Sequence, residues 1–330
     1  MRTLLLIIFT ASSSFCYSQK KQNVYYFKGN EILVKTKEEA EYIRVIQEPD
    51  SGSVLYNLLE FYSDNTRKTL GTVSKFEPTL VYEGQVVTFY KNGKKRDVAN
   101  YKNGQQTGER YLYYKNGRLK QRDNLQKIED LNHSKSPVTW QYKLWEYYDS
   151  TGVVLVKDGK GIFKTLDEAP KIYEEGPYSN GVKEGIWHGT FLKENASYEE
   201  RYENGKLIWG KAKLKDGSIT EYTSDEEMPK YKGGIENFYY YVGRSFRYPA
   251  ESMQRGMKGR VIVSFVVQQD GSLTDVKAVK DLGHGTGEEA VRVVRSSPKW
   301  IPGRQHGVPV RVQYTLPLSL NLPPVDPFKN

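Results

Sequence analysis

Apolar and polar residues alternate over short stretches along most of this chain. The clearest case is the stretch 308–317, in which Val308, Val310, Val312, Tyr314 and Leu316 alternate with Pro309, Arg311, Gln313 and Thr315. Such period-two alternation places the apolar side chains on one face of a β-strand, which is then expected to be buried. Residues 260–267 have the same character. The pattern therefore predicts a mostly β chain whose strands bury one face each.

The C-terminal part adds helices to this pattern. The expected elements are a helix at 250–255, strands at 260–267 and 273–279, a helix at 288–296 and a strand at 308–317. Asp270-Gly271 is typical of a hairpin turn between the first two strands. The order of these elements predicts an α+β domain with a three-stranded antiparallel sheet and two helices.

A short phrase recurs in the middle of the chain: a tyrosine, two residues, then glycine. It stands at 90–93, 101–104, 114–117 and 202–205, each time with Asn before the glycine. Gly93 and Gly117 are 24 residues apart, as are Gly181 and Gly205. Asn-Gly supplies the positive φ angles that a two-residue hairpin turn requires. The spacing therefore predicts stacked β-hairpin repeats over residues 81–222, each of which packs against its neighbours.

The N-terminus carries a targeting segment. Arg2 is followed by the apolar run Leu4–Phe9 and by small and polar residues, which is typical of a signal peptide covering residues 1–18. An uncleaved membrane anchor is the first alternative, although a spanning helix needs about 20 apolar residues. A lipoprotein signal that uses Cys16 is the second. Cys16 is the only cysteine, so a chain cut before Gln19 has neither disulfide nor thiol chemistry.

Two further regions complete the organisation. Residues 19–80 form an N-terminal β-rich region, in which 24–27 and 32–34 are expected to be strands. Residues 223–239 are polar and contain Pro229 and a Gly-Gly pair, which predicts a linker before the C-terminal domain at 240–330.

Composition and motifs limit the function. The net charge of +9 is compatible with nucleic acid, anionic lipid or acidic protein partners, and export argues against nucleic acid. None of the four histidines is spaced as a zinc motif, and no P-loop, dinucleotide fingerprint or Gly-x-Ser-x-Gly occurs. The 26 tyrosines could stack on sugars, although tyrosine at hairpin spacing is more typical of packing. We therefore expect no enzyme activity, no catalytic residue, no metal, no cofactor and no small-molecule substrate.

Two regions of the chain resemble known families. Residues 81–222 resemble MORN-type repeats, closest to the variant in bacterial antitoxin-like proteins, and such repeats imply a binding surface. Residues 240–320 resemble the TonB C-terminal domain. The short motifs that carry this second resemblance follow one another in the order found in the family. They include Pro249, Gly259, Asp270, Gly271, Trp300, Pro302 and Gly303.

The TonB resemblance implies a mode of binding. Domains of this family bind an extended segment of an outer-membrane transporter, which adds as a strand to the edge of their sheet. In this sequence the implied edge is 308–317. The implied contact residues are Arg247, Tyr248, Arg311, Gln313 and Thr315, although Tyr248, Trp300 and Tyr314 are more typical of core residues than of direct contacts.

Three functional hypotheses follow. The first is a periplasmic, non-enzymatic adaptor that captures an envelope protein, such as a TonB-dependent outer-membrane transporter, with self-association through the sheet edge left open. The second is an energy transducer anchored in the inner membrane by an uncleaved N-terminal segment. The third is an envelope protein that binds carbohydrate or peptidoglycan through the repeats.

Overall fold

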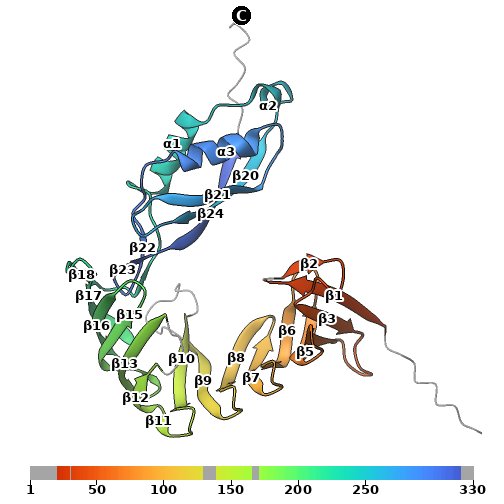
Figure 1. Cartoon of the computed structure of the whole chain (residues 1–330), viewed down its shortest axis with the longest axis vertical. Coiled ribbons are helices and arrows are strands. Elements are labelled where there is room, and N and C mark those ends of the chain that lie inside the picture. The colour runs from red at the N-terminus through yellow and green to blue at the C-terminus, as the bar shows by residue number, and fades with distance from the viewer. Residues whose placement is uncertain (1–20, 30, 129–138, 166–170, 321–330) are drawn as a thin grey trace, which may run out of the picture. The chain divides into compact units, whose positions relative to one another are not determined.

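A computed structural model describes residues 21–29, 31–128, 139–165 and 171–320 (Figure 1). The chain forms two compact units that divide after Lys160, and each is considered by itself. The expected signal peptide at 1–18 lies outside the described residues, as do parts of the repeat region. Within the described ranges, no helix is long and apolar enough to cross a membrane.

The first unit is a series of antiparallel strands. They are β1 (Gln22–Lys28), β2 (Ile32–Val34), β3 (Tyr42–Gln47), β4 (Tyr56–Tyr62), β5 (Arg67–Lys75), β6 (Val81–Phe89), β7 (Lys95–Lys102), β8 (Gln105–Tyr113), β9 (Leu119–Ile128), β10 (Thr139–Tyr148) and β11 (Val154–Lys157). From β3 to β11 each described strand pairs with the next one along the chain. The strands predicted at 24–27 and 32–34 are confirmed as β1 and β2.

The repeat turns are of two kinds. Asn103-Gly104 is the expected two-residue turn, because both residues have positive φ. At Asn92-Gly93 only the glycine has positive φ, and the N–H of Tyr90 donates to the carbonyl of Lys94. This is the three-residue loop in which a type I turn is followed by a left-handed glycine. The prediction of a two-residue turn is therefore wrong at Gly93, where the loop has one residue more.

The repeated tyrosine and asparagine tie each three-residue loop to the next. The hydroxyl bonds run from Tyr62 to the Phe89 carbonyl (2.9 Å), from Tyr90 to that of Tyr113 (2.8 Å) and from Tyr114 to that of Tyr148 (2.7 Å). The amide bonds run from Asn92 to the Lys115 carbonyl (2.7 Å) and from Asn116 to that of Ser150 (2.9 Å). The hydrogen bonds of the recurring motif thus fix the spacing of successive hairpins.

The second unit begins with further hairpins. Their strands are β12 (Lys160–Lys164), β13 (Ile172–Ser179), β14 (Val182–Lys183), β15 (Gly185–Phe191), β16 (Ala196–Glu203), β17 (Lys206–Lys213) and β18 (Ile219–Tyr222). Glycines inside these strands make room for aromatic rings on the neighbouring strand. A Cβ at Gly189 would lie 2.0 Å from the ring of Tyr198, and one at Gly210 would lie 2.3 Å from Tyr222. Both are direct cross-strand pairs.

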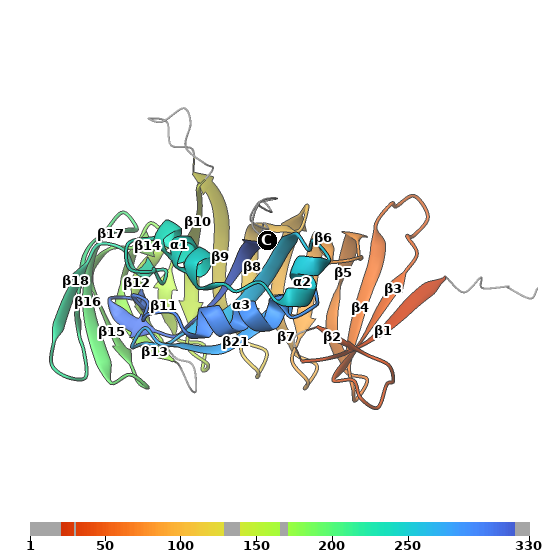
Figure 2. The ribbon, with the colours of Figure 1, turned by 90° about the horizontal axis from the view of Figure 1, so that it is seen from above.

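The C-terminal domain completes the second unit. Its elements are β19 (Glu226–Glu227), α1 (Ile235–Ser245), α2 (Ala250–Gln254), β20 (Gly259–Val267), β21 (Leu273–Lys280), α3 (Thr286–Arg295), β22 (Gly303–Gln305), β23 (Val308–Val310) and β24 (Val312–Leu320). The predicted three-stranded antiparallel sheet is confirmed, in the order β21-β20-β24. Its core joins Phe238 and Val242 of α1 to Val293 of α3 and Phe265 of β20, so α1 and α3 cover the same face (Figure 2).

The helix α1 was not predicted. It begins at Ile235, inside the stretch expected to be a linker, and β19 in the same stretch pairs with β22. Phe238 and Val242 are one helical turn apart and both buried, which is why this segment folds onto the sheet. The domain therefore has three helices where two were expected.

The strand predicted at 308–317 is wrong in its bounds. Val308–Val310 is β23, which pairs with β22 in a separate small sheet, whereas β24 begins at Val312 and runs to Leu320. The alternation continues across the break because both segments bury one face, but they bury it against different partners. Val308 packs among the repeat hairpins, and Leu316 packs in the core of the C-terminal domain.

The residues that carry the resemblance to the TonB C-terminal domain occupy turns, strand ends and close contacts. Pro249 caps α2, Gly259 opens β20, and Pro302 is half-buried before β22. Asp270 accepts hydrogen bonds from Ser272 and Lys299. Close approaches explain two glycines: a Cβ at Gly271 would lie 1.9 Å from the carbonyl oxygen of Trp300, and one at Gly303 would lie 2.7 Å from the side chain of Val312.

Candidate functional site

The strand β24 has one free edge. It pairs with β20 through nine residues, Val312 to Leu320, with no register shift. In the described part of the chain no strand pairs with its other side. An unpaired edge presents a row of backbone N–H and C=O groups that a further extended segment can bond.

Pro317 shows which backbone groups of β24 point outward. Proline has no N–H, so within a paired strand its nitrogen lies on the unpaired side. Backbone groups of successive residues point to alternate sides of an antiparallel strand. Gln313, Thr315 and Ser319 therefore direct their N–H and C=O groups away from β20. The free edge offers three N–H donors and, with Pro317, four carbonyl acceptors.

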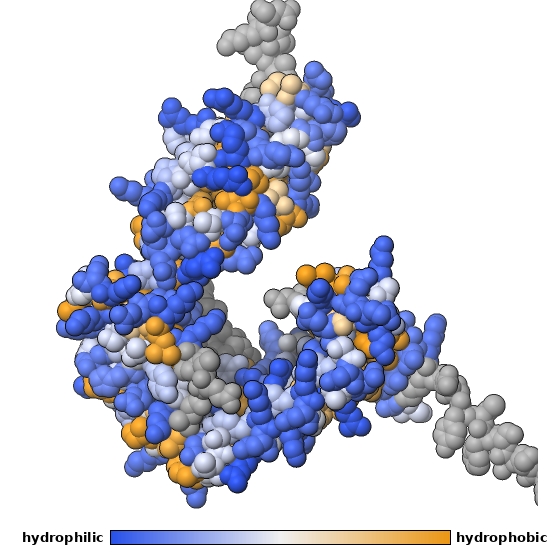
Figure 3. Space-filling model, in the orientation of Figure 1, coloured by the Kyte–Doolittle hydropathy of each residue, from blue (hydrophilic) through white to orange (hydrophobic). Residues whose placement is uncertain are grey.

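A groove runs beside the C-terminal half of β24. Exposed apolar residues elsewhere are scattered, and on the face shown in Figure 3 they form small separate patches. The groove has a volume of about 780 Å³, and its lining includes Tyr239, Val242, Phe246, Tyr248, Leu318 and Leu320. Leu318 and Leu320 face the helices, since they alternate with exposed Pro317 and Ser319. A strand added at the edge would direct every second side chain toward this apolar groove.

The structure places the expected contact residues unequally. Tyr248 lines the groove, where its ring meets Phe246 edge-on at 5.2 Å. Gln313 and Thr315 lie on β24 but on its exposed face, and Gln313 donates to the Ser264 hydroxyl (3.2 Å). Their outward contribution is the backbone and not the side chain.

The two arginines stand apart from the groove. Arg247 is exposed, and its backbone N–H donates to Glu289 Oε1 (2.7 Å). Arg311 is exposed between β23 and β24, with a guanidinium nitrogen 3.7 Å from Asp275 Oδ2. The apolar lining residues were missed. The continued alternation of Leu316, Leu318 and Leu320 beyond Pro317 is the signal that could have found two of them.

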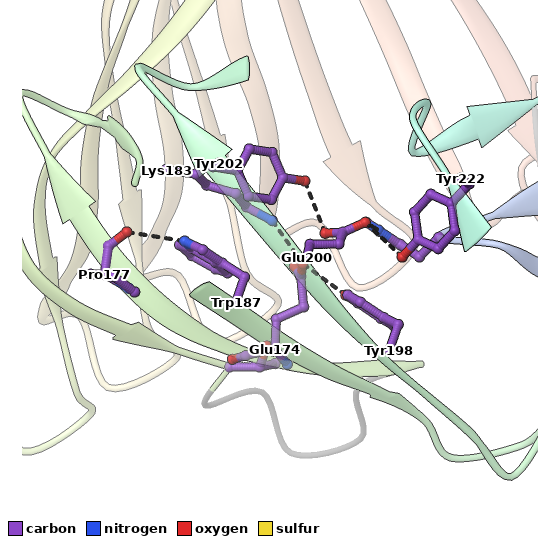
Figure 4. Close-up of polar contacts among 10 residues, drawn as sticks. Glu174, Pro177, Lys183, Trp187, Tyr198, Glu200, Tyr202 and Tyr222 are labelled. Carbon is purple, nitrogen blue, oxygen red and sulfur yellow. Dashed lines mark hydrogen bonds and ion pairs between the residues drawn. The ribbon is translucent and has the colours of Figure 1, made fainter. Parts of the chain in front are cut away.

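A buried polar cluster lies where the β22–β23 hairpin meets the repeats. Glu200 of β16 is fully buried. Its carboxylate accepts hydrogen bonds from the hydroxyls of Tyr202 and Tyr222, both at 2.9 Å, which approach it from different strands (Figure 4). Its Oε1 also lies 2.7 Å from Nδ1 of His306. The ring of His306 stacks on Tyr198 at 4.3 Å.

These contacts decide how Glu200 titrates. Burial alone raises the pKa of a carboxyl group, but the hydrogen bonds from His306, Tyr202 and Tyr222 outweigh burial and hold the pKa of Glu200 below its usual value. Burial, followed by the charge of Glu200, raises the pKa of Tyr222. Glu200 is therefore ionised at neutral pH and forms a buried anion whose partners are all donors.

The described residues hold no group of three or more histidine, cysteine, aspartate or glutamate side chains that could bind a metal ion. The features that remain are a sheet edge, an apolar groove and a buried ionic cluster that joins two parts of the second unit. Such features suit the binding of a polypeptide.

The match to known families agrees with this geometry. Residues 244–322 match the family model described as Gram-negative bacterial TonB protein C-terminal. This part of the chain is a TonB C-terminal domain. The matched span includes β20, β21, α3 and the free edge β24.

Individual relatives match the same part of the chain. One Protein TonB of Helicobacter pylori is 27% identical over 107 residues, which is 29% of this chain and 36% of that protein. A Protein TonB from another strain is 33% identical over 70 residues, 20% of this chain and 25% of the relative. The chain thus spans about a third or less of each relative. The solution structure of the Helicobacter pylori TonB C-terminal domain has 27% identity and a TM-score of 0.21, and the match covers 28% of this chain and 89% of that one.

Proposed function

We propose that this chain is a non-enzymatic protein-binding protein of the periplasm, whose TonB C-terminal domain captures an extended partner segment by adding it as a strand to β24. The observation that carries the proposal is the unpaired edge of β24 beside an apolar groove. Strand addition draws its affinity from backbone hydrogen bonds and its specificity from the pockets for alternate side chains.

The proposed partner is an envelope protein, with a TonB-dependent outer-membrane transporter as the first candidate, because both relatives are named Protein TonB. The groove lining favours a segment with apolar residues at alternate positions. The hairpin repeats would present a second surface, so that the whole chain acts as an adaptor. Their resemblance to MORN-type repeats stays a prediction.

A pair of substitutions at one position tests strand addition. Thr315→Pro removes an outward N–H and leaves the β20 ladder intact, whereas Thr315→Ala changes the side chain and keeps the N–H. We would titrate full-length protein against synthetic peptides that cover the periplasmic N-terminal segments of outer-membrane transporters, and measure binding by fluorescence anisotropy. Thr315→Pro should weaken the binding of the recovered peptide about tenfold or more, as the loss of at least one buried hydrogen bond implies; Thr315→Ala should bind like the wild type.

A second pair guards against misfolding. Ser319→Pro and Ser319→Ala repeat the comparison two residues away, and the melting temperature of each variant shows whether the domain is folded. Equal affinity for the proline and alanine variants at both positions would contradict capture by the β24 edge. Absence of binding to any transporter segment would contradict the proposed partner class.

Location needs its own test. The proposed periplasmic location follows from the signal-like segment at 1–18. Intact-mass spectrometry of protein purified from its native envelope gives the N-terminal residue. A start at Gln19 supports export with cleavage, whereas a start at Met1 supports the anchored energy transducer.

A further inference from the structure

The hairpin of β22 and β23 docks its tip onto the last repeat hairpins. His306 and Gly307 form its two-residue turn, and both have positive φ. A Cβ at Gly307 would lie 2.6 Å from the ring of Tyr222 and 3.1 Å from Ala212, so only glycine allows this approach. Next to the turn, Val308 is 2% exposed and packs in a cluster with Phe191, Ala196, Tyr198, Ala212 and Tyr222. The repeats thus provide a fitted surface for this hairpin.

Glu200 is the ionic centre of that contact. Three donors converge on its carboxylate, two from the repeats and one, His306, from the docked turn. The backbone N–H of His306 also donates to the carbonyl of Asp225 (2.6 Å). His306 is one of the three donors to this buried carboxylate, so removal of the charge at Glu200 would destabilise the docked position of the hairpin tip.

The docked hairpin leads directly into β24, the strand with the free edge. Only Arg311 separates Val310, the end of β23, from Val312, the start of β24. Gly303 of β22 packs against the side chain of Val312, where a Cβ would lie 2.7 Å from it. We therefore expect a change in the position of the hairpin to reach the first residues of β24.

We propose that Glu200, in the repeat region, is a positioning residue for partner capture: by holding the tip of the β22–β23 hairpin it fixes the start of the β24 edge. The consequence for partner binding rests on the function proposed above, whereas the positioning itself does not. The repeats then serve the C-terminal domain as a brace in addition to any partner that they bind themselves.

Hydrogen–deuterium exchange of the full-length protein tests the positioning without any partner. Glu200→Gln keeps the shape and removes the charge. We expect the amides of 303–312 to exchange about 10- to 100-fold faster, the range that corresponds to the loss of a hydrogen bond to a charged group. The amides of 259–267 in the central strand should not change. Glu60→Gln is the matched control, because Glu60 is also buried (2% exposed) but is bound by Arg44, Lys68 and Thr69 in the other unit.

Two outcomes would overturn the proposal. One is unchanged exchange at 303–312 in Glu200→Gln, and the other is an equal acceleration at 259–267, which would mean general destabilisation. If Glu200→Gln does not fold, Tyr222→Phe removes a single hydrogen bond from the same carboxylate and should accelerate exchange at 303–312 to a smaller extent.

Peptide binding provides the second readout. A transporter peptide recovered in the anisotropy assay should dissociate faster from Glu200→Gln than from wild type or Glu60→Gln. If no peptide binds the wild type, the proposed function fails while the exchange result still decides the positioning role.

Discussion

Gly271 is the residue whose replacement gives the sharpest test of the packing in the C-terminal domain. It lies in the turn between β20 and β21 with φ +81°. The backbone N–H of Trp300 donates to its carbonyl at 2.9 Å, and the Trp300 carbonyl oxygen occupies the place of a Cβ. Gly271→Ala would put a methyl group 1.9 Å from that oxygen.

The cost follows from three contributions. The left-handed backbone costs a residue with a Cβ about 1–2 kcal/mol. Moving a main-chain oxygen by more than about 1 Å in a packed region adds about 1–3 kcal/mol. The Trp300–Gly271 hydrogen bond, worth about 0.5–1.5 kcal/mol, is strained by the same movement. We expect Gly271→Ala to reduce the stability of the C-terminal domain by about 3–6 kcal/mol, a large part of the 5–15 kcal/mol typical of a domain.

Gly217 is a matched control within the same unit. It lies in an identical Asp-Gly-Ser turn with φ +84°, but no heavy atom lies within 4 Å of its would-be Cβ. Gly217→Ala should therefore cost only the backbone contribution of about 1–2 kcal/mol. Hydrogen exchange of the β20 amides, and of the β17 amides for the control, gives the free energy of opening in each place. Equal losses in the two variants would refute the argument that the approach of Trp300 requires glycine at 271.

Three further predictions concern the repeats and their buried charges. Gly210→Ala should destabilise the last repeat hairpins by about 1–3 kcal/mol through overpacking against Tyr222, and urea denaturation that shows no loss would contradict that fit. Tyr90→Phe should lower the free energy of unfolding by about 1 kcal/mol, because it removes the hydrogen bond to the Tyr113 carbonyl. Tyr142→Phe, at a position that is 54% exposed, is the control and should leave that free energy unchanged in the same urea titration. Burial raises the pKa of Glu60, but Lys68, Thr69 and Arg44 outweigh burial and leave that pKa below its usual value near 4.5. The ionised Glu60 therefore stabilises the fold fully above pH 4.5, and this stabilisation is lost as the pH falls through the lowered pKa. The melting temperature of Glu60→Gln should accordingly depend less on pH below 4.5 than that of the wild type.

The C-terminal sheet could be predicted because its signals are local. Period-two alternation and the Asp270-Gly271 turn report on neighbouring residues only, and β20 and β21 follow them closely. The helix α1 was not predicted because the polar stretch before it, with Pro229 and a Gly-Gly pair, is typical of a linker, and because tyrosine and phenylalanine are enriched in strands. What makes it helical is burial of Phe238 and Val242 against a sheet that begins about fifteen residues later.

The contacts with the repeats could not be predicted in the same way. Glu200 and His306 are 106 residues apart, and no local pattern relates them. One signal was nevertheless present, since Glu200 alternates in phase with Ala196, Tyr198 and Tyr202, which are all buried. A charged residue on the buried face of a strand requires donors, so the position of an ionic contact was readable although its partner was not.

The same contacts determine which fragment can serve in binding experiments. A fragment that begins at residue 240 lacks Phe238, which is fully buried in the core, and the loss of a buried phenylalanine side chain costs about 3–5 kcal/mol. It also lacks β19, which pairs with β22, and the repeat surface that covers Val308. We therefore expect the 240–330 fragment to be largely unfolded at 25 °C, whereas the 161–330 fragment retains all of these contacts.

Circular dichroism and exchange measurements on the two fragments can decide the matter. The longer fragment should melt cooperatively and protect the β20 amides as the full chain does. A cooperative transition and native protection in the 240–330 fragment would contradict the view that the repeats and α1 are integral to the C-terminal domain. It would also remove the physical reason for linking Glu200 to the β24 edge, because an edge that forms without the repeats does not need their brace.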